Sequence, residues 1–154
     1  MRKPIVTSVL FIASGCAFSG PAQTSGPSLA PEGVLVGLLG QYCGQDTGPN
    51  WMNSGLSEIA LKLEITNRTP EELQIHRDHM QLRPHRARPS NENSWHAGQA
   101  MRLASGKGAT MSVHFFTPAS QSCTDDLELD LQGAFTVRDR PVPLEPIRFV
   151  AHSL

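Results

Sequence analysis

A regular alternation of apolar and polar side chains over residues 57–67 is the strongest constraint on how this chain can fold. The apolar side chains occupy every second position: Ile59, Leu61, Leu63 and Ile65. The positions between them are charged or polar, except for Ala60. A period of two is typical of an antiparallel strand that is buried on one face. Asn67, which tolerates turn geometry, and Pro70, which cannot donate to a ladder, are predicted to end the strand.

The rest of the folded part has the same character, with short alternating segments separated by turn residues. A first strand is predicted over residues 33–42, with a bend at Gly37 or Gly40. Residues 105–108 lie between two predicted strands and contain two glycines, which indicates a hairpin. Further strands are predicted at 71–76, 80–82, 99–104, 109–116, 126–131, 135–137 and 142–151.

Short strands with turn signals and no convincing helix predict an all-β fold. The expected architecture is a two-sheet antiparallel β-sandwich of about seven or eight short strands. Its layout resembles the immunoglobulin-like domains of exported bacterial proteins. The chain has 154 residues, of which 39% are hydrophobic and 18% charged, and this is enough for one domain with a core.

The N-terminus has the features of an export signal. Basic residues at positions 2 and 3 precede an apolar run over residues 5–13. That run is shorter than the roughly 20 residues that a membrane-spanning helix needs, so it is interpreted as a secretory signal. Residues 12–16, which end in Cys16, resemble the lipobox of bacterial lipoproteins, with Ala13 where Leu is usual. An ordinary signal peptide that is cleaved a few residues later is the alternative.

The lipobox resemblance implies a division of the chain into parts and a cellular location. Residues 1–15 would be the signal peptide, 16–32 the lipidated Cys16 with a flexible Ser/Gly/Pro linker, and 33–154 the sandwich domain. Ala17 is not Asp, which in enterobacterial lipoproteins favours the outer membrane. The expected location is therefore the bacterial cell envelope, where lipid would hold the chain, facing the periplasm or the cell surface.

The cysteine count agrees with that organisation. Three cysteines are an odd number for an exported chain. If Cys16 carries lipid, then Cys43 and Cys123 remain as a pair, which an oxidising compartment would join. Two unrelated buried thiols are the alternative.

Histidines and methionines raise the possibility of copper binding, because imidazole and thioether ligands suit that metal. The candidate ligands in residues 76–114 are His76, His79, His85 and His96. On one strand, His76 and His79 would point to opposite faces, so only a turn lets them converge. Met80, Met101 and Met111 fall at positions expected to fill the core. Solvated loop histidines are the simpler interpretation, and no cofactor is predicted.

The same region is basic, and this allows two interpretations. The planar guanidinium groups of Arg77, Arg83, Arg86 and Arg88 would suit anionic groups on a partner or polysaccharide. In the alternative, an acidic strip neutralises them within the domain or across a partner: Asp125, Asp126, Glu128 and Asp130.

Charge and motifs restrict the function classes. Formal net charge is −1, and removal of the first fifteen residues leaves 11 basic and 14 acidic side chains. This balance argues against nucleic acid as a partner. The sequence has no G-x-S-x-G elbow and no phosphate-binding glycine loop. The prediction is a non-catalytic binding or assembly module that contacts the membrane through its lipid and an envelope protein or polysaccharide through loops at one end. A periplasmic copper carrier is the alternative.

Overall fold

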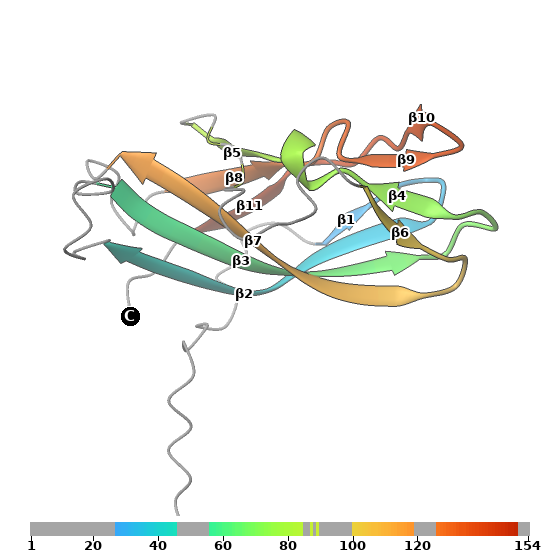
Figure 1. Cartoon of the computed structure of the whole chain (residues 1–154), viewed down its shortest axis with the longest axis horizontal. Helices are drawn as coiled ribbons and strands as arrows, with labels where there is room; N and C mark the ends of the chain where they lie inside the picture. Colours follow the sequence, from blue (N-terminus) through green and yellow to red (C-terminus); the bar gives the residue numbers. More distant parts are fainter. Residues whose placement is uncertain are drawn as a thin grey trace, which may run out of the picture.

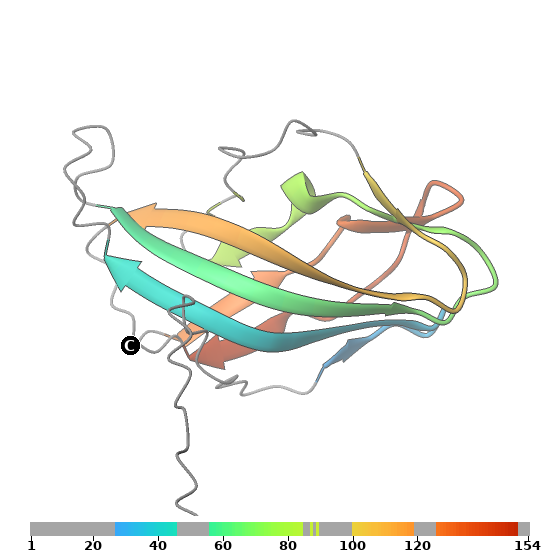
Figure 2. The ribbon, with the colours of Figure 1, turned by 60° about the horizontal axis from the view of Figure 1, so that its bottom comes forward.

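The described chain folds into two layers of antiparallel strands that pack face to face (Figures 1 and 2). The computed structural model describes residues 27–45, 56–84, 87, 89, 100–118 and 126–150. The first layer is one sheet in the order β1-β2-β3-β7. Its strands are β1 (Ser28–Leu29), β2 (Val34–Gln45), β3 (Leu56–Asn67) and β7 (Gly108–Pro118). The all-β, antiparallel sandwich predicted from the sequence is confirmed.

The second layer consists of two shorter sheets, ordered β10-β9-β4-β6 and β11-β8-β5. Their strands are β4 (Leu73–Ile75), β5 (Gln81–Arg83), β6 (Met101–Leu103), β8 (Asp126–Asp130), β9 (Phe135–Val137), β10 (Arg140–Pro141) and β11 (Ile147–Val150). A 3-10 turn, η1 (Arg77–His79), interrupts the run from β4 to β5. Another turn separates β8 from β9. The two turns are joined by a hydrogen bond, because the His76 amide donates to the Ala134 carbonyl oxygen at 2.7 Å. Eleven strands are described, more than predicted, and β1 and β10 are the two that the sequence did not indicate.

Strand β3 lies between β2 and β7, and its alternation is the one read from the sequence. Ile59, Leu61, Leu63 and Ile65 are at most 1% exposed. Leu63 is paired across the sheet with Leu38 on β2 and with Met111 on β7. The core that covers this face from the second layer includes Phe135 and Phe149. Burial of this face against the opposite layer therefore fixes the position of β3.

A β-bulge in β2 changes which residues face the core. The register shifts between Leu38 and Gly40, and Leu39 at the bulge is 43% exposed. Before the shift, Val34, Val36 and Leu38 are buried; after it, Gln41 and Cys43 are buried instead. One extra residue inverts the alternation. The bend predicted at Gly37 or Gly40 is present at this point.

The predicted hairpin around residues 105–108 is wrong. Strand β6 pairs with β4 in the second layer, whereas β7 pairs with β3 in the first. The intervening turn therefore crosses between layers. Backbone bonds hold this turn at the end of β3: the Asn67 amide donates to the Lys107 carbonyl oxygen, and the Asn67 carbonyl oxygen accepts from the Gly106 amide, at 2.9 and 2.8 Å. The chain therefore enters β7 beside β3 after the turn, whereas β6 before the turn lies beside β4.

The domain begins earlier than predicted. Strand β1 pairs with Val36 and Leu35 of β2, and Ala30 is 1% exposed within the core. Residues 27–32, which were assigned to the linker, thus belong to the folded part. Across the described ranges, the structure has no helix with the length and apolar character needed to span a membrane.

Candidate functional site

The 3-10 turn η1 brings His76 and His79 together on the second layer. His76 precedes the turn and His79 is its last residue. Their ring centroids are 5.2 Å apart and the rings are nearly parallel, at 18°. An extended strand would have placed these two side chains on opposite faces. The turn therefore supplies the convergence that the sequence left open.

His76 contacts strand β9, and His79 contacts the turn that precedes it. The Nε2 atom of His76 lies 3.2 Å from Thr136 Oγ1, and Nδ1 of His79 lies 2.9 Å from the Gly133 carbonyl oxygen. A carbonyl only accepts, so Nδ1 of His79 is the donor and Nε2 faces outward, 3.9 Å from Asp78 Oδ2. This resembles the way proteins orient histidine ligands.

The pair is too small to form a metal centre by itself. The described residues contain no group of three or more His, Cys, Asp or Glu side chains that could hold an ion. His85 and His96, which complete the predicted set, lie outside the described residues. A metal on His76 and His79 would need ligands from such segments.

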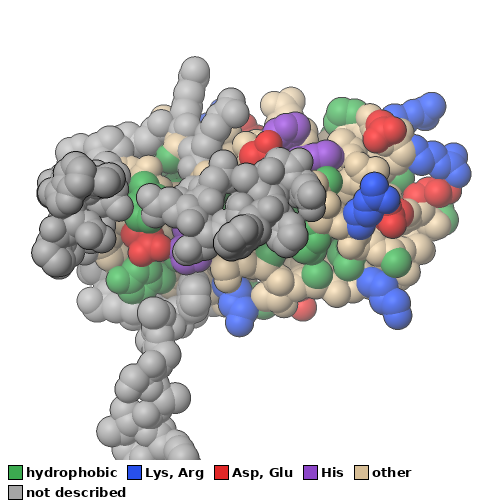
Figure 3. Space-filling model, in the orientation of Figure 1, with side chains coloured by type: hydrophobic (Ala, Val, Ile, Leu, Met, Phe, Trp, Pro, Cys, Tyr) green, Lys and Arg blue, Asp and Glu red, His purple; other side chains and the backbone are tan. Residues whose placement is uncertain are grey.

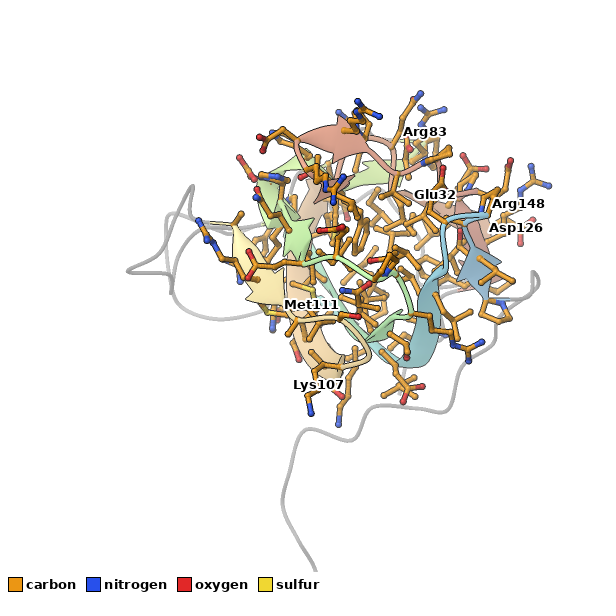
Figure 4. The ribbon with its side chains drawn as sticks, turned by 90° about the vertical axis from the view of Figure 1, so that its right-hand side faces the viewer. Glu32, Arg83, Lys107, Met111, Asp126 and Arg148 are labelled. Atoms are coloured by element: carbon orange, nitrogen blue, oxygen red, sulfur yellow. The ribbon has the colours of Figure 1, made fainter. Side chains whose placement is uncertain are left out.

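The acidic strip meets one of the predicted anion-binding arginines. Arg83 Nη2 is 2.5 Å from Asp130 Oδ2, and its Nη1 is 4.0 Å from Glu128 Oε1. Arg148 on β11 approaches Glu128 as well, at 3.3 Å. Figure 4 shows Arg148 and Asp126 on the same side of the domain, with Arg83 pointing outward nearby. For Arg83, this is the contact expected from neutralisation within the domain.

Of the other candidate arginines, only Arg77 lies among the described residues. Arg77 lies in η1, away from the acidic strip in sequence and half-buried. Arg86, Arg88 and Asp125 lie outside the described residues. Next to the strip, between β8 and β11, a hollow of about 400 Å³ is lined by Asp126, Leu127, Glu128, Arg148 and Phe149. Opposite charges line the same space, so it does not favour an ion of either sign.

Cys43 points into the core from β2, where it is 4% exposed and disulfide-bonded. It is the only cysteine among the described residues. Its pairing with Cys123, like the lipidation of Cys16, therefore stays a prediction.

A second cluster, which sequence reasoning missed, lies on the outer face of the first layer. The register places Tyr42, Ala60 and His114 in one row across β2, β3 and β7. Gly44, Glu58 and Phe116 form the next row. The alternation gave the outward direction of Glu58 and His114, but only the strand pairing shows that they are neighbours. We call Tyr42, Glu58, His114 and Phe116 the β3 outer cluster.

Two contacts organise this cluster. His114 Nδ1 and Glu58 Oε1 are 2.6 Å apart, a short hydrogen bond from imidazole to carboxylate. The Tyr42 side chain lies over Gly44, where an added Cβ would be 2.3 Å from its hydroxyl oxygen and 2.7 Å from Cζ. A residue with a side chain at position 44 would displace the ring. The glycine two positions after Tyr42 is the sequence signal that could have indicated this arrangement.

Comparison with known proteins finds no matching family model, curated protein or solved structure. The function of the chain is therefore inferred from its own residues and their geometry.

Proposed function

We propose that the chain is a lipid-anchored, exported β-sandwich that acts as a non-catalytic binding or assembly module of the bacterial cell envelope. The observation that carries this proposal is the order of parts along the chain. The N-terminal sequence resembles an export signal with a lipobox that ends at Cys16, and the first described strand, β1, begins at Ser28. The Ser/Gly/Pro-rich sequence after Cys16 would be the tether between lipid and domain. Lipid would hold the module, and the tether would keep it close to the membrane surface.

The fold supports a role that depends on outer faces and ends. Apolar side chains of both layers fill the interior, with Phe115, Phe135 and Phe149 at most 1% exposed. Contacts with other molecules would therefore be made from outside. The end of β2, the start of β3 and the end of β7 lie at the same end of the first layer, because Leu56 pairs with Pro118 and Gln45 with Ser57. This end fits the predicted contact end, since the opposite end is closed by the bonds of Asn67.

The anchor is the first test. We expect Cys16→Ser to move the protein from the membrane fraction to the soluble fraction, or to stop its maturation, because serine cannot carry the thioether-linked lipid. The measurement is membrane fractionation followed by mass spectrometry of the N-terminus. Ser19→Ala, which leaves the lipobox-like residues intact, is the matched control and should stay with the membrane. Equal membrane retention of the serine variant and the wild type would contradict the proposal.

A copper carrier is a second candidate, and the His76–His79 pair is what favours it. The two imidazoles lie on one turn with centroids 5.2 Å apart, and the Gly133 carbonyl orients one of them. Imidazole is a common copper ligand, and His85 and His96 would have to complete the site. The near-parallel stacking of the rings is less favourable, because their nitrogen lone pairs lie in the ring planes and do not converge on one point.

Copper titration of the full chain separates the two candidates. The binding-module proposal expects weak, non-stoichiometric Cu²⁺ binding in calorimetry, unchanged when His76 and His79 are both replaced by Ala. A carrier would instead bind one ion per chain and lose that binding in the double variant. His114→Ala, on the other layer, is the control for loss of an exposed histidine. Saturable one-to-one binding that only the double variant removes would favour the carrier.

A further inference from the structure

The β3 outer cluster combines a carboxylate with aromatic rings on both neighbouring strands. Glu58 lies on the middle strand, with Gly44 under the Tyr42 ring on one side and Phe116 on the other. Tyr42 and Phe116 are half-buried, and the Glu58 side chain is 32% exposed. Figure 3 shows acidic, histidine and hydrophobic side chains gathered on the face that β2, β3 and β7 form. The carboxylate is thus accessible but partly shielded from water.

The contacts of the cluster hold this carboxylate in place. His114 Nδ1 bonds to Oε1 at 2.6 Å, which fixes the side chain and leaves the second oxygen for another donor. Ala60, between Tyr42 and His114, is 2% exposed, so these larger neighbours cover the sheet there. Lys62 and Glu64 are the next outward charges on the strand, roughly 13 and 20 Å from Glu58 by strand rise.

We propose that the β3 outer cluster is a binding site for a cationic side chain, a lysine or arginine presented by a basic segment of a partner protein. A carboxylate gives a charge-assisted hydrogen bond to an ammonium or guanidinium group. Aromatic side chains on the two neighbouring strands can attract the same cation and pack against its aliphatic stem. The net acidic balance of the chain after residue 15 favours the approach of such a segment. The inference rests on the proposed function, because it takes the partner to be another protein of the envelope.

A second position on the same strand provides the matched control. Glu64 points outward from β3 like Glu58, but its cross-strand neighbours are Gly37 and Thr110. It has the same charge without the aromatic flanks and without a histidine partner. A site made by the cluster should therefore depend on Glu58, whereas general charge attraction would depend on both carboxylates equally.

The experiment is a titration of the full chain with a short oligolysine peptide, followed by calorimetry at low salt. We expect Glu58→Gln to weaken binding about tenfold and Glu64→Gln by less than about twofold. Tyr42→Leu should weaken binding several-fold. Gly44→Ala should do the same without touching the carboxylate, because its Cβ would push the Tyr42 ring away. All four positions are at least partly exposed, so the thermal unfolding of each variant should stay near that of wild type.

Three results would overturn the site. Equal losses in Glu58→Gln and Glu64→Gln would show attraction by overall charge only. No measurable binding of oligolysine by the wild type would exclude a cationic ligand. Binding of a neutral oligosaccharide that Tyr42→Leu abolishes and Glu58→Gln spares would assign the face to sugars instead. None of these depends on the anchor, which Cys16→Ser tests separately.

Discussion

Leu63→Asp is expected to unfold the domain or to leave it only marginally stable. Leu63 is fully buried at the centre of β3, between Leu38 and Met111 on the neighbouring strands. An aspartate there would bring a charge between the two layers without a partner. A cost of about 5 kcal/mol or more would remove much or all of the stability of a typical domain. Urea unfolding followed by circular dichroism measures the loss.

Two companion variants show whether the register is the cause. Leu63→Ala removes apolar volume without adding charge and should cost about 3 kcal/mol. Glu64→Lys, one residue on, changes an exposed side chain on the other face and should alter the unfolding free energy by about 0.5 kcal/mol or less. If Leu63→Asp and Glu64→Lys were equally mild, the two faces of β3 would not be as described.

The alternation of β3 was predictable because it is a local signal. The large apolar residues from Ile59 to Ile65 have to face the core, and a period of two gives that result only in a strand. The strands predicted at 71–76 and 126–131 follow the same rule, because Leu73, Ile75, Leu127 and Leu129 alternate and are all buried. The sandwich followed from many such strands with no helix between them.

Strand pairing was not predictable in the same way, because it depends on competition between distant segments. The residues at 105–108 signal a turn correctly but do not say which strands the turn connects. A long-range contact accompanies this pairing: the Asn67 side-chain amide donates to the carbonyl oxygen of Leu103, 36 residues away in sequence, at 2.9 Å. From the sequence, Asn67 was only a residue suited to ending a strand.

The candidate sites show the same division. That His79 and Glu58 are polar, surface-facing residues follows from pattern alone. That His79 stacks on His76, and that Glu58 bonds to His114, depends on a turn and on a register that no local pattern encodes. The predicted boundary at residue 33 was late because β1 is only two residues long, which is too short to show an alternation.

Asn67→Asp is expected to have the second large effect on stability. The Asn67 side chain makes hydrogen bonds to several segments at the end of the sandwich where β3 ends. It is fully buried, and its side-chain amide donates to the carbonyl oxygens of Glu71 and Leu103 at 2.8 and 2.9 Å. Its Oδ1 accepts from the amide and the hydroxyl of Thr69 at 3.0 and 2.7 Å. These bonds join the β3–β4 crossing to the β6–β7 crossing.

An aspartate has nearly the same shape but cannot make the two donations when it is ionised. Its second oxygen would face two carbonyl oxygens in a buried site. The expected loss is about 3–5 kcal/mol in the free energy of unfolding. Arg68→Ala, at the exposed next position, should change it by about 0.5 kcal/mol or less.

Comparison with Asn67→Leu over a pH series distinguishes lost bonds from buried charge. The leucine variant leaves the two carbonyls and both Thr69 donors without their partner at every pH. The aspartate variant keeps the acceptor for Thr69, and a protonated carboxyl can restore one of the two donations. The stability of Asn67→Asp relative to Asn67→Leu should therefore rise as the pH falls toward about 4, because the buried carboxyl binds its proton at a higher pH than the exposed carboxyl of the unfolded chain. A difference between the two variants that did not change with pH would contradict a buried carboxylate at this position. A loss no larger than that of Arg68→Ala would show that the closed end does not depend on Asn67.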